Sequence, residues 1–427
     1  MNTEERPPSS ARAKAGTATV AVIGYDGSAL SPAARAALAA STLVVGTARN
    51  LDGVGTPDRA SRVLLGDPRL AYARLTAHLA DRHGGPATVV APGDPGFFGV
   101  LRALRISGFE VVAYPSTTAV AAAFGRAGLP WDDAVVVSVT DDETLARAAN
   151  IARAHPKVAV LAAAEFGPHR IAAALRGADR AIIVAQHLGE PDEAVERMTP
   201  AEAVARTVWG EPNIVLILDE DRLRTEPLRG PRWGEGWVSS WAGPSAAWAV
   251  PDNAFVARGP QVLPSEARAL VLARLAPRLG SLVWDVGAGA GAVGVECARL
   301  GAAVVAVERD PDSCERISLN ASMHGIDVEV VCGLAPNALA DLPRPDSVYV
   351  GTSRAYVIRA CATTGARTVV AAVSAVDRLD EVKKALRVGG RRVDGVLLHA
   401  SRLAQVSGDA FRLAAAAPVF VLWGELG

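Results

Sequence analysis

The feature that most constrains the fold of this chain is a glycine-rich stretch in its second half. Residues Trp284–Glu296 read WDVGAGAGAVGVE and connect an apolar run typical of a buried strand to a stretch typical of a helix. Gly287, Gly289 and Gly291 allow the backbone to turn sharply and to approach a ligand closely. The stretch therefore predicts an α/β unit that binds a small molecule at the end of a strand.

Two carboxylates help to decide which small molecule this is. Glu308 ends the next predicted strand, where it can accept hydrogen bonds from both ribose hydroxyls of an adenosine. The glycines also fit the dinucleotide pattern GxGxxG/A, with Ala292 in the third position. Asp285 argues against a dinucleotide, because a carboxylate repels a pyrophosphate and attracts the ammonium group of a methionine. A dinucleotide-dependent oxidoreductase remains the alternative.

The pattern DxGxGxG, followed by an acid at the next strand end, resembles the class I S-adenosylmethionine methyltransferases. The resemblance implies a Rossmann-like doubly wound domain. The residues that it assigns to the cofactor are Gly287, Ala288, Gly289, Ala290, Gly291, Glu308 and Ala335, and the charge argument adds Asp285. Glu296, one helical turn beyond the loop, is either a base near the substrate or a paired structural acid, and we favour the second.

A second candidate site lies in the first half of the chain. PGDPGFFG (Pro92–Gly99) follows a predicted strand and forms a rigid turn whose backbone groups can face a ligand. After the next strand come the hydroxyl cluster Ser116, Thr117 and Thr118 and a helix of small residues, which leaves room for a bulky ligand. Taken alone, these features are also compatible with ordinary loop chemistry.

These first-half motifs resemble the tetrapyrrole methylase family, the class III S-adenosylmethionine fold with two α/β subdomains. VIGYDGSALSPAAR (Val22–Arg35) is similar to the opening strand and loop of that family, and GTARNL (Gly46–Leu51) to a stretch of its cobalamin-pathway branch. The resemblance implies that the cofactor contacts in this half are Gly93, Asp94, Thr118 and Ala119.

The order of the two modules resembles the precorrin-6Y methyltransferase family of corrin synthesis. The resemblance implies that the first module methylates carbon 5 of the macrocycle, and that the second methylates carbon 15 and decarboxylates the ring-C acetate. It implies S-adenosylmethionine as cofactor, S-adenosylhomocysteine as product, a tetrapyrrole substrate, no metal or redox cofactor, and a homo-oligomer. The substrate's electron-rich carbons supply the nucleophile, so the enzyme needs to align the reactants and exclude water.

Several positions depart from the family pattern. Where the family often has a threonine that contacts the cofactor, followed by a lysine, this chain has Leu263 and Pro264. Leu334 stands where the family often has an acid. Asp141 falls where the first module usually has a histidine-containing turn, and Asn50 replaces a usual histidine. The alternatives are a divergent methyltransferase for another tetrapyrrole or a specialised metabolite, with one module inactive, and a tetrapyrrole carrier without catalysis.

Composition restricts the remaining possibilities. The 44 basic and 45 acidic residues nearly balance, whereas nucleic-acid-binding proteins more often carry a basic excess. No apolar run is long enough to span a bilayer, and the four cysteines and seven histidines show no metal-binding spacing. We therefore expect a cytoplasmic protein with no nucleic-acid or membrane partner. The predicted segments are a disordered leader (1–17), the tetrapyrrole methylase module (18–220), a linker rich in Trp, Pro and Gly (221–250) and the class I methyltransferase module (251–427).

Overall fold

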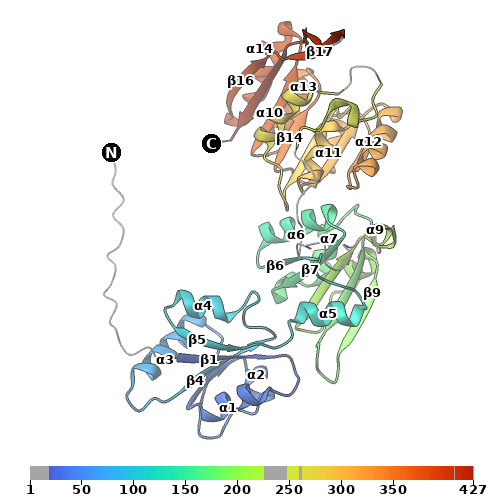
Figure 1. Cartoon of the computed structure of the whole chain (residues 1–427). Coiled ribbons are helices and arrows are strands. Elements are labelled where there is room, and N and C mark those ends of the chain that lie inside the picture. The colour runs from blue at the N-terminus through green and yellow to red at the C-terminus, as the bar shows by residue number, and fades with distance from the viewer. Residues whose placement is uncertain (1–18, 226–247, 259–261, 408, 427) are drawn as a thin grey trace, which may run out of the picture. The chain divides into compact units, whose positions relative to one another are not determined.

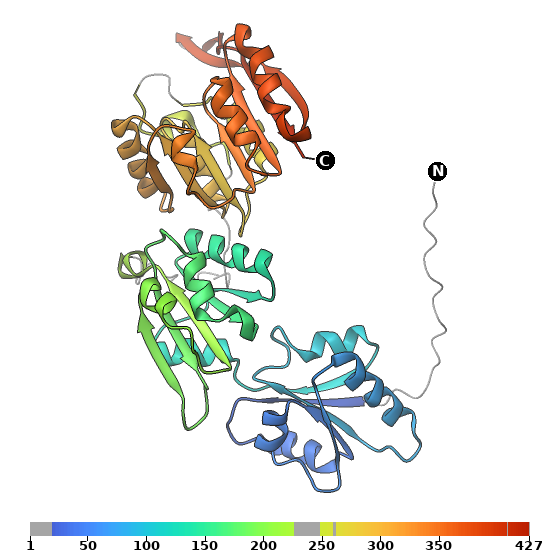
Figure 2. The same cartoon turned by 180° about the vertical axis from the view of Figure 1, so that it is seen from behind.

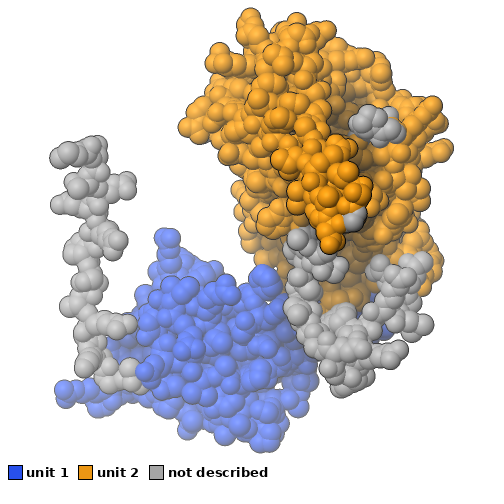
Figure 3. Space-filling model, turned by 45° about the horizontal axis from the view of Figure 1, so that its top comes forward, with its two compact units in different colours: residues 1–131, 183–196, 209–214 blue, residues 132–182, 197–208, 215–427 orange. Residues whose placement is uncertain are grey.

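The computed structural model describes residues 19–225, 248–258, 262–407 and 409–426. The predicted leader and most of the predicted linker lie outside these residues. The contacts divide the chain into two compact units (Figure 3). The first unit takes residues 1–131, 183–196 and 209–214, and the second takes 132–182, 197–208 and 215–427.

The N-terminal part of the chain forms a five-stranded parallel sheet in the order β3-β2-β4-β1-β5. Its strands are β1 (Thr19–Tyr25), β2 (Leu43–Gly46), β3 (Ser61–Leu64), β4 (Ala87–Pro92) and β5 (Glu110–Tyr114). Helices α1 (Pro32–Ala40) and α2 (Ala48–Gly53) pack on one face, and α3 (Pro68–Ala80) and α4 (Val100–Ile106) on the other (Figure 1). Helix α5 (Ala119–Ala127) follows β5. Ser31 caps α1 and Pro32 opens it.

A second five-stranded sheet has the order β6-β7-β10-β8-β9. Its strands are β6 (Val135–Val139), β7 (Lys157–Ala162), β8 (Ala181–Gln186), β9 (Ala194–Met198) and β10 (Asn213–Leu218). The helices of this part are α6 (Asp142–Ala154), η1 (Ala164–Phe166), α7 (Pro168–Ala174), α8 (Pro200–Ala205) and α9 (Glu220–Thr225). Asp141 caps α6 by accepting a hydrogen bond from the Thr144 backbone N–H, so this departure from the family pattern has a local structural role.

The C-terminal part forms a seven-stranded sheet in the order β13-β12-β11-β14-β15-β19-β16. The strand pairs from β13 to β15 are parallel, and β19 runs antiparallel to both of its neighbours. Its strands are β11 (Leu282–Val286), β12 (Ala303–Glu308), β13 (Glu329–Cys332), β14 (Ser347–Val350), β15 (Thr368–Val373), β16 (Arg392–Leu398) and β19 (Val419–Glu425). At the edge of this sheet, β16 pairs antiparallel with β19.

Helices cover both faces of this sheet, as the predicted doubly wound domain requires (Figures 1 and 2). One face carries α10 (Ser265–Leu275), α11 (Ala292–Arg299) and α12 (Pro311–Met323), and the other carries α13 (Ala355–Ala362) and α14 (Leu379–Leu386). Short turns are η2 (Asp252–Ala254), η3 (Asn337–Leu339), η4 (Val376–Arg378) and η5 (Val388–Gly390), and β17 (Ser401–Ser407) pairs with β18 (Ala410–Ala415) in a separate hairpin. Among the described residues, none of the helices has the length and apolar character needed to cross a membrane.

Candidate functional site

The glycine-rich loop follows β11 at the carboxyl end of the C-terminal sheet. Gly287 and Gly289 have positive φ angles of 73° and 59°, a conformation that strongly favours glycine. The Gly287 N–H donates to the carbonyl of Val307 in β12, at 2.8 Å, which fixes the start of the loop against the neighbouring strand. The loop is therefore held open at the point where parallel α/β sheets bind their ligands.

Glu308 ends β12 and faces this loop. Its carboxylate accepts three backbone hydrogen bonds, from Gly289 at 3.0 Å, Arg309 at 2.8 Å and Asp310 at 3.1 Å. The Glu308 side chain thus orders both the glycine loop and the turn into α12. It is only partly buried, so it can also accept hydrogen bonds from a ligand.

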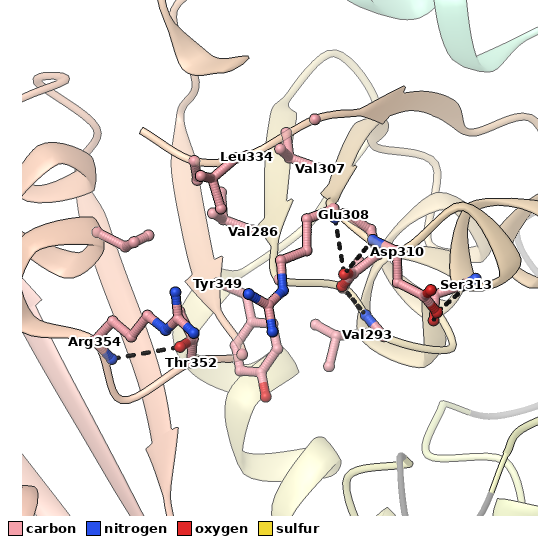
Figure 4. Close-up of a pocket in the computed structure, with 18 of the residues that line it drawn as sticks. Val286, Val293, Val307, Glu308, Asp310, Ser313, Leu334, Tyr349, Thr352 and Arg354 are labelled. Carbon is pink, nitrogen blue, oxygen red and sulfur yellow. Dashed lines mark hydrogen bonds between the residues drawn. The ribbon is translucent and has the colours of Figure 1, made fainter. Parts of the chain in front are cut away.

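A cavity of about 880 Å³ opens over the loop and the adjoining strand ends (Figure 4). Gly287, Ala288, Gly289, Glu308 and Ala335, five of the predicted cofactor residues, all line it. Its remaining walls come from the ends of the neighbouring strands and the loops after them, including Leu263, Val293, Asp310, Ser313, Leu334, Tyr349, Thr352, Arg354 and Tyr356. Leu263 and Leu334, two of the departures from the family pattern, therefore lie on the wall of this cavity.

Ala290 and Gly291 were predicted to contact the cofactor, but they do not line the cavity. The Ala290 carbonyl accepts a hydrogen bond from Asn320, at 2.8 Å, in the interior. Gly291 is the N-cap of α11, where an added Cβ would lie 3.0 Å from Ile317. Both residues turn the chain from the loop into the helix, and this structural role explains their small size.

Asp285 is also absent from the cavity wall, contrary to a direct contact with the cofactor. Its side chain is fully buried, and its Oδ2 accepts a hydrogen bond from the Gly294 N–H in α11, at 2.8 Å. The Oδ1 atom has no partner among the described residues. Burial raises the pKa of Asp285 from 3.8 to about 7; the Gly294 hydrogen bond opposes this rise, and the negative charge of Glu308 adds to it.

The raised pKa of Asp285 predicts a pH-dependent stability. In the unfolded chain the Asp285 carboxyl loses its proton near pH 4, whereas in the folded protein it keeps the proton until about pH 7. The contribution of Asp285 to the free energy of unfolding is therefore fully present below pH 4. It is lost as the pH rises to 7. Asp285→Asn removes the ionisable group and with it this pH-dependent loss of stability. The amide oxygen of asparagine still offers an acceptor for the Gly294 N–H. We expect the free energy of unfolding of the variant, relative to the original protein, to increase by up to about 4 kcal/mol between pH 4 and 7. Urea denaturation at several pH values measures this difference, and a constant difference would contradict the prediction.

Glu296 is a buried structural acid. Its side chain is fully inaccessible and forms an ion pair with the equally buried Arg268 of α10, at 2.5 Å. The second carboxylate oxygen accepts a hydrogen bond from the Ala249 N–H. Arg268 also donates to the carbonyls of Val250 and Leu263, so the pair fastens the segment before α10 to the helix after the loop. Glu296 does not reach the cavity and cannot act as a base there.

The first unit contains a separate cavity of about 690 Å³. Of the predicted residues, Gly93 and Ala119 line it, whereas Asp94 and Thr118 do not. Both of these side chains have local roles instead. Asp94 accepts from the Gly96 N–H at 2.7 Å, and Thr118 caps α5 by accepting from the Ala121 N–H at 2.9 Å. They shape the two loops around the cavity without reaching into it.

The end of β1 brings the sequence motifs of the first half together. A Cβ on Gly24 would lie 2.2 Å from the Gly93 carbonyl, so only glycine allows these two loops to meet. Asp26 follows and lines the cavity. Burial opposes ionisation of Asp26, but hydrogen bonds from Ser28, Ser116 and Thr117 outweigh it and lower its pKa to about 2. The first cavity therefore has a permanently charged carboxylate on its wall.

Asn50 offers this cavity a hydrogen-bond donor. The residue is 4% exposed, and its Nδ2 has no partner among the described residues. Buried amide groups without partners are rare in folded proteins, so a ligand is the natural acceptor. Neither Asp26 nor Asn50 was predicted as a site residue. The resemblance of VIGYDGSALSPAAR and GTARNL to family motifs was the signal that contained them.

A group near the same cavity has the side chains needed to hold a cation. The ligand atoms of His187, Glu190 and Asp192 lie within 4.8 Å of one another. Glu190 forms an ion pair with Arg49, and His187 forms a hydrogen bond with Asp192 at 2.5 Å. These side chains thus already satisfy one another, and we assign no metal to them.

Comparisons with known proteins agree with this two-site arrangement. Residues 22–213 match the family model for tetrapyrrole (corrin/porphyrin) methylases, and residues 253–422 match the model for the precorrin methyltransferase domain. The chain is 30% identical over 352 residues to a precorrin-6Y C(5,15)-methyltransferase [decarboxylating] of Sinorhizobium sp, with 78% of each chain covered. It is 33% identical over 339 residues to the protein of the same name from Mycobacterium tuberculosis, covering 77% of this chain and 79% of the relative.

The chain also has shorter relatives. Over 114 residues, 25% of this chain, it is 37% identical to a probable cobalt-precorrin-6B C(15)-methyltransferase (decarboxylating) from Pyrobaculum calidifontis, of which 58% is covered.

Proposed function

Since the chain belongs to the family of decarboxylating precorrin-6Y C(5,15)-methyltransferases, we propose that it methylates its tetrapyrrole at two carbons and decarboxylates it, with one cofactor site in each module. The chain is a methyltransferase of cobalamin biosynthesis. The observation that carries the proposal is the presence of two separate cavities, each built around a glycine turn at the end of a parallel strand.

We assign carbon 5 to the first module and carbon 15, with the decarboxylation, to the second. The family models support this division, because the model for the precorrin methyltransferase domain matches residues 253–422, and a shorter relative from Pyrobaculum calidifontis is named for carbon 15 and decarboxylation alone. The family model for tetrapyrrole methylases matches the first half only.

The cavity of the second module, which lies over the Gly287 loop and is called the second cavity below, has the features that S-adenosylmethionine needs. Gly287 and Gly289 keep the loop free of side chains, and Glu308 offers carboxylate oxygens for ribose hydroxyls. Asp285 contributes from beneath the loop, because a buried carboxyl with an unpaired oxygen favours a nearby cationic group. When bound, the cofactor supplies a methyl group on a positively charged sulfur. The residues of the chain hold the reactants in line and exclude water.

The first cavity fits the same cofactor through a different arrangement. The exposed side of α5 presents Ala119, Ala121, Ala122 and Gly125 to the cavity, so a bulky ligand can lie against the helix. Asp26 provides a negative charge and Asn50 an unpaired donor. We infer that these two groups fix the polar ends of the cofactor or the substrate, because the rest of the wall is largely small and apolar.

Gly125→Leu tests the first site without disturbing the fold. A Cβ at Gly125 meets no atom within 4 Å, and the residue lies inside α5, where leucine is favoured over glycine by roughly 0.5–1 kcal/mol. The leucine side chain should project into the cavity where a ligand would lie against α5, and so abolish S-adenosylhomocysteine binding to the first module. Calorimetric titration should then show one site fewer than in the unchanged chain, at unchanged thermal stability. Two intact sites in the variant would show that the cofactor lies elsewhere.

The full reaction is tested with precorrin-6Y and S-adenosylmethionine. Mass spectrometry of the product should show two added methyl groups and the loss of one carbon dioxide. A product with a single methyl group would show that one module is inactive, and no conversion would overturn the assignment of the substrate.

We also propose that the chain forms a homo-oligomer. The β17–β18 hairpin carries Leu403, Phe411 and Leu413, which are 72%, 60% and 69% exposed, and Leu403 pairs with Leu413 in register. Isolated two-stranded hairpins are marginally stable in water, and exposed apolar faces of this kind favour a second copy. Light scattering on the full chain measures the molar mass in solution, which distinguishes a monomer from a homo-oligomer.

A further inference from the structure

The second cavity continues into a basic hollow beyond β14. This hollow has a volume of about 1040 Å³ and shares Arg354 and Tyr356 with the cofactor cavity. Its other walls come from α13 and the segment around α14, with Ser353, Ala355, Arg359, Ala360, Thr363, Arg378, Glu381 and Lys384. The two spaces therefore form one continuous surface, with the predicted cofactor loop at one end.

The two ends of this surface differ in charge. Glu308 and Asp310 follow β12, whereas Arg354 follows β14, and β11 lies between these strands in the sheet. Figure 4 shows Arg354 and Thr352 on one side of Tyr349 and Glu308 on the other. The acidic end suits a cofactor with ribose hydroxyls and a cationic sulfur, so the basic end is left for the substrate.

Not all cations of the hollow are available to a ligand. Arg378 pairs with Glu381 at 3.2 Å, and Lys384 pairs with Asp380 at 2.7 Å. Arg354 and Arg359, in contrast, have no carboxylate partner among the described residues, and both are exposed. The Arg354 guanidinium donates to the Tyr356 hydroxyl, at 3.1 Å, which orients it along the wall.

In the sequence, an exposed aromatic residue lies between the two arginines. Tyr356 is 50% exposed and lines both spaces. An aromatic ring beside free guanidinium groups matches a flat conjugated molecule with carboxylates on its rim, because the ring provides a stacking surface and each guanidinium can bind a carboxylate through two hydrogen bonds.

We propose that Arg354 and Arg359 bind peripheral carboxylates of the tetrapyrrole, and that Tyr356 supports the face of its macrocycle. The arginines place the substrate over the β14 end of the cavity, next to the cofactor, and so determine specificity for acidic tetrapyrroles. The inference rests on the proposed function of the second module and adds the residues that recognise its substrate.

The test uses Arg354→Gln, Arg359→Gln and the double variant in the full chain. We expect each single change to raise the KM for precorrin-6Y in carbon dioxide release by roughly 5- to 20-fold, and the double change to raise it further, because charge-assisted hydrogen bonds are lost. The affinity for S-adenosylhomocysteine at the second site should stay within about twofold in Arg359→Gln, since Arg359 lines the basic hollow and not the cofactor cavity.

Arg278→Gln is the matched control. Arg278 is an exposed arginine that forms no ion pair with any described residue, and it precedes β11, at the opposite end of this strand from the glycine loop. Raising the salt concentration should increase the KM of the original protein and of this control, but much less that of the double variant. A KM of the double variant within twofold of the original would overturn the inference. Absence of turnover by the original protein would instead overturn the proposed function and the inference with it.

Discussion

Replacing Glu296 with glutamine is expected to destabilise the C-terminal module by up to about 3–5 kcal/mol, because it removes the closer and fully buried carboxylate partner of the Arg268 guanidinium. Both side chains are completely inaccessible to solvent. Arg268 keeps an ion pair with Asp252 at 3.3 Å, but this carboxylate is farther away and partly exposed, so it compensates only in part. Hydrogen exchange in increasing urea, read on peptides from α10 and α11, measures the loss of stability in this module alone.

Glu266→Gln is the matched control for this experiment. Glu266 also belongs to the α10 region, but it pairs with Arg402 on the surface, where the side chains are 42% and 46% exposed. Exposed pairs contribute at most about 1 kcal/mol, so this variant should remain close to the original. If Glu296→Gln proved as stable as the control yet lost methyl transfer to carbon 15, Glu296 would be a catalytic base after all.

Replacing Glu308 with alanine is expected to weaken S-adenosylhomocysteine binding at the second site by about 1.5–3 kcal/mol, which corresponds to roughly 10- to 150-fold in Kd. The loss has two sources. The variant has no carboxylate for the ribose hydroxyls, and it leaves the N–H groups of Gly289, Arg309 and Asp310 without their acceptor.

Calorimetric titration of the full chain measures the effect of Glu308→Ala, since the first site stays as an internal reference. Glu315→Ala, an exposed acid on the neighbouring α12, serves as the control and should bind normally at both sites. Unchanged affinity at the second site in Glu308→Ala would mean that the cofactor does not lie over this strand end.

Local sequence patterns were sufficient for most of the fold. The glycine-rich stretch predicted the turn from β11 into α11, and the next apolar run predicted that β12 ends at Glu308. The place of β19 between β15 and β16 could not be read in this way, because it depends on which edge the last strand joins. Helix α9 continues to Thr225, past the predicted module boundary at residue 220, since nothing in its charged sequence marks the end.

The site was predicted in part for a similar reason. Spacing alone placed Gly287, Gly289 and Glu308 on one cavity wall, because all three lie at the ends of adjacent strands. The burial of Asp285 and the pairing of Glu296 with Arg268 depend on how helices pack over the sheet, which spacing does not reveal. Arg354 and Arg359 could not be selected among many basic residues until the structure placed them beside the cavity without a carboxylate partner among the described residues.

The central claim is that this chain binds its cofactor twice, once in each module. The most direct measurement is a calorimetric titration of S-adenosylhomocysteine into the full chain and into the Glu308→Ala and Gly125→Leu variants. We predict two sites in the unchanged chain, loss of the second-module site in Glu308→Ala, and loss of the first-module site in Gly125→Leu. A single site in the unchanged chain, affected by only one of the two substitutions, would contradict the claim.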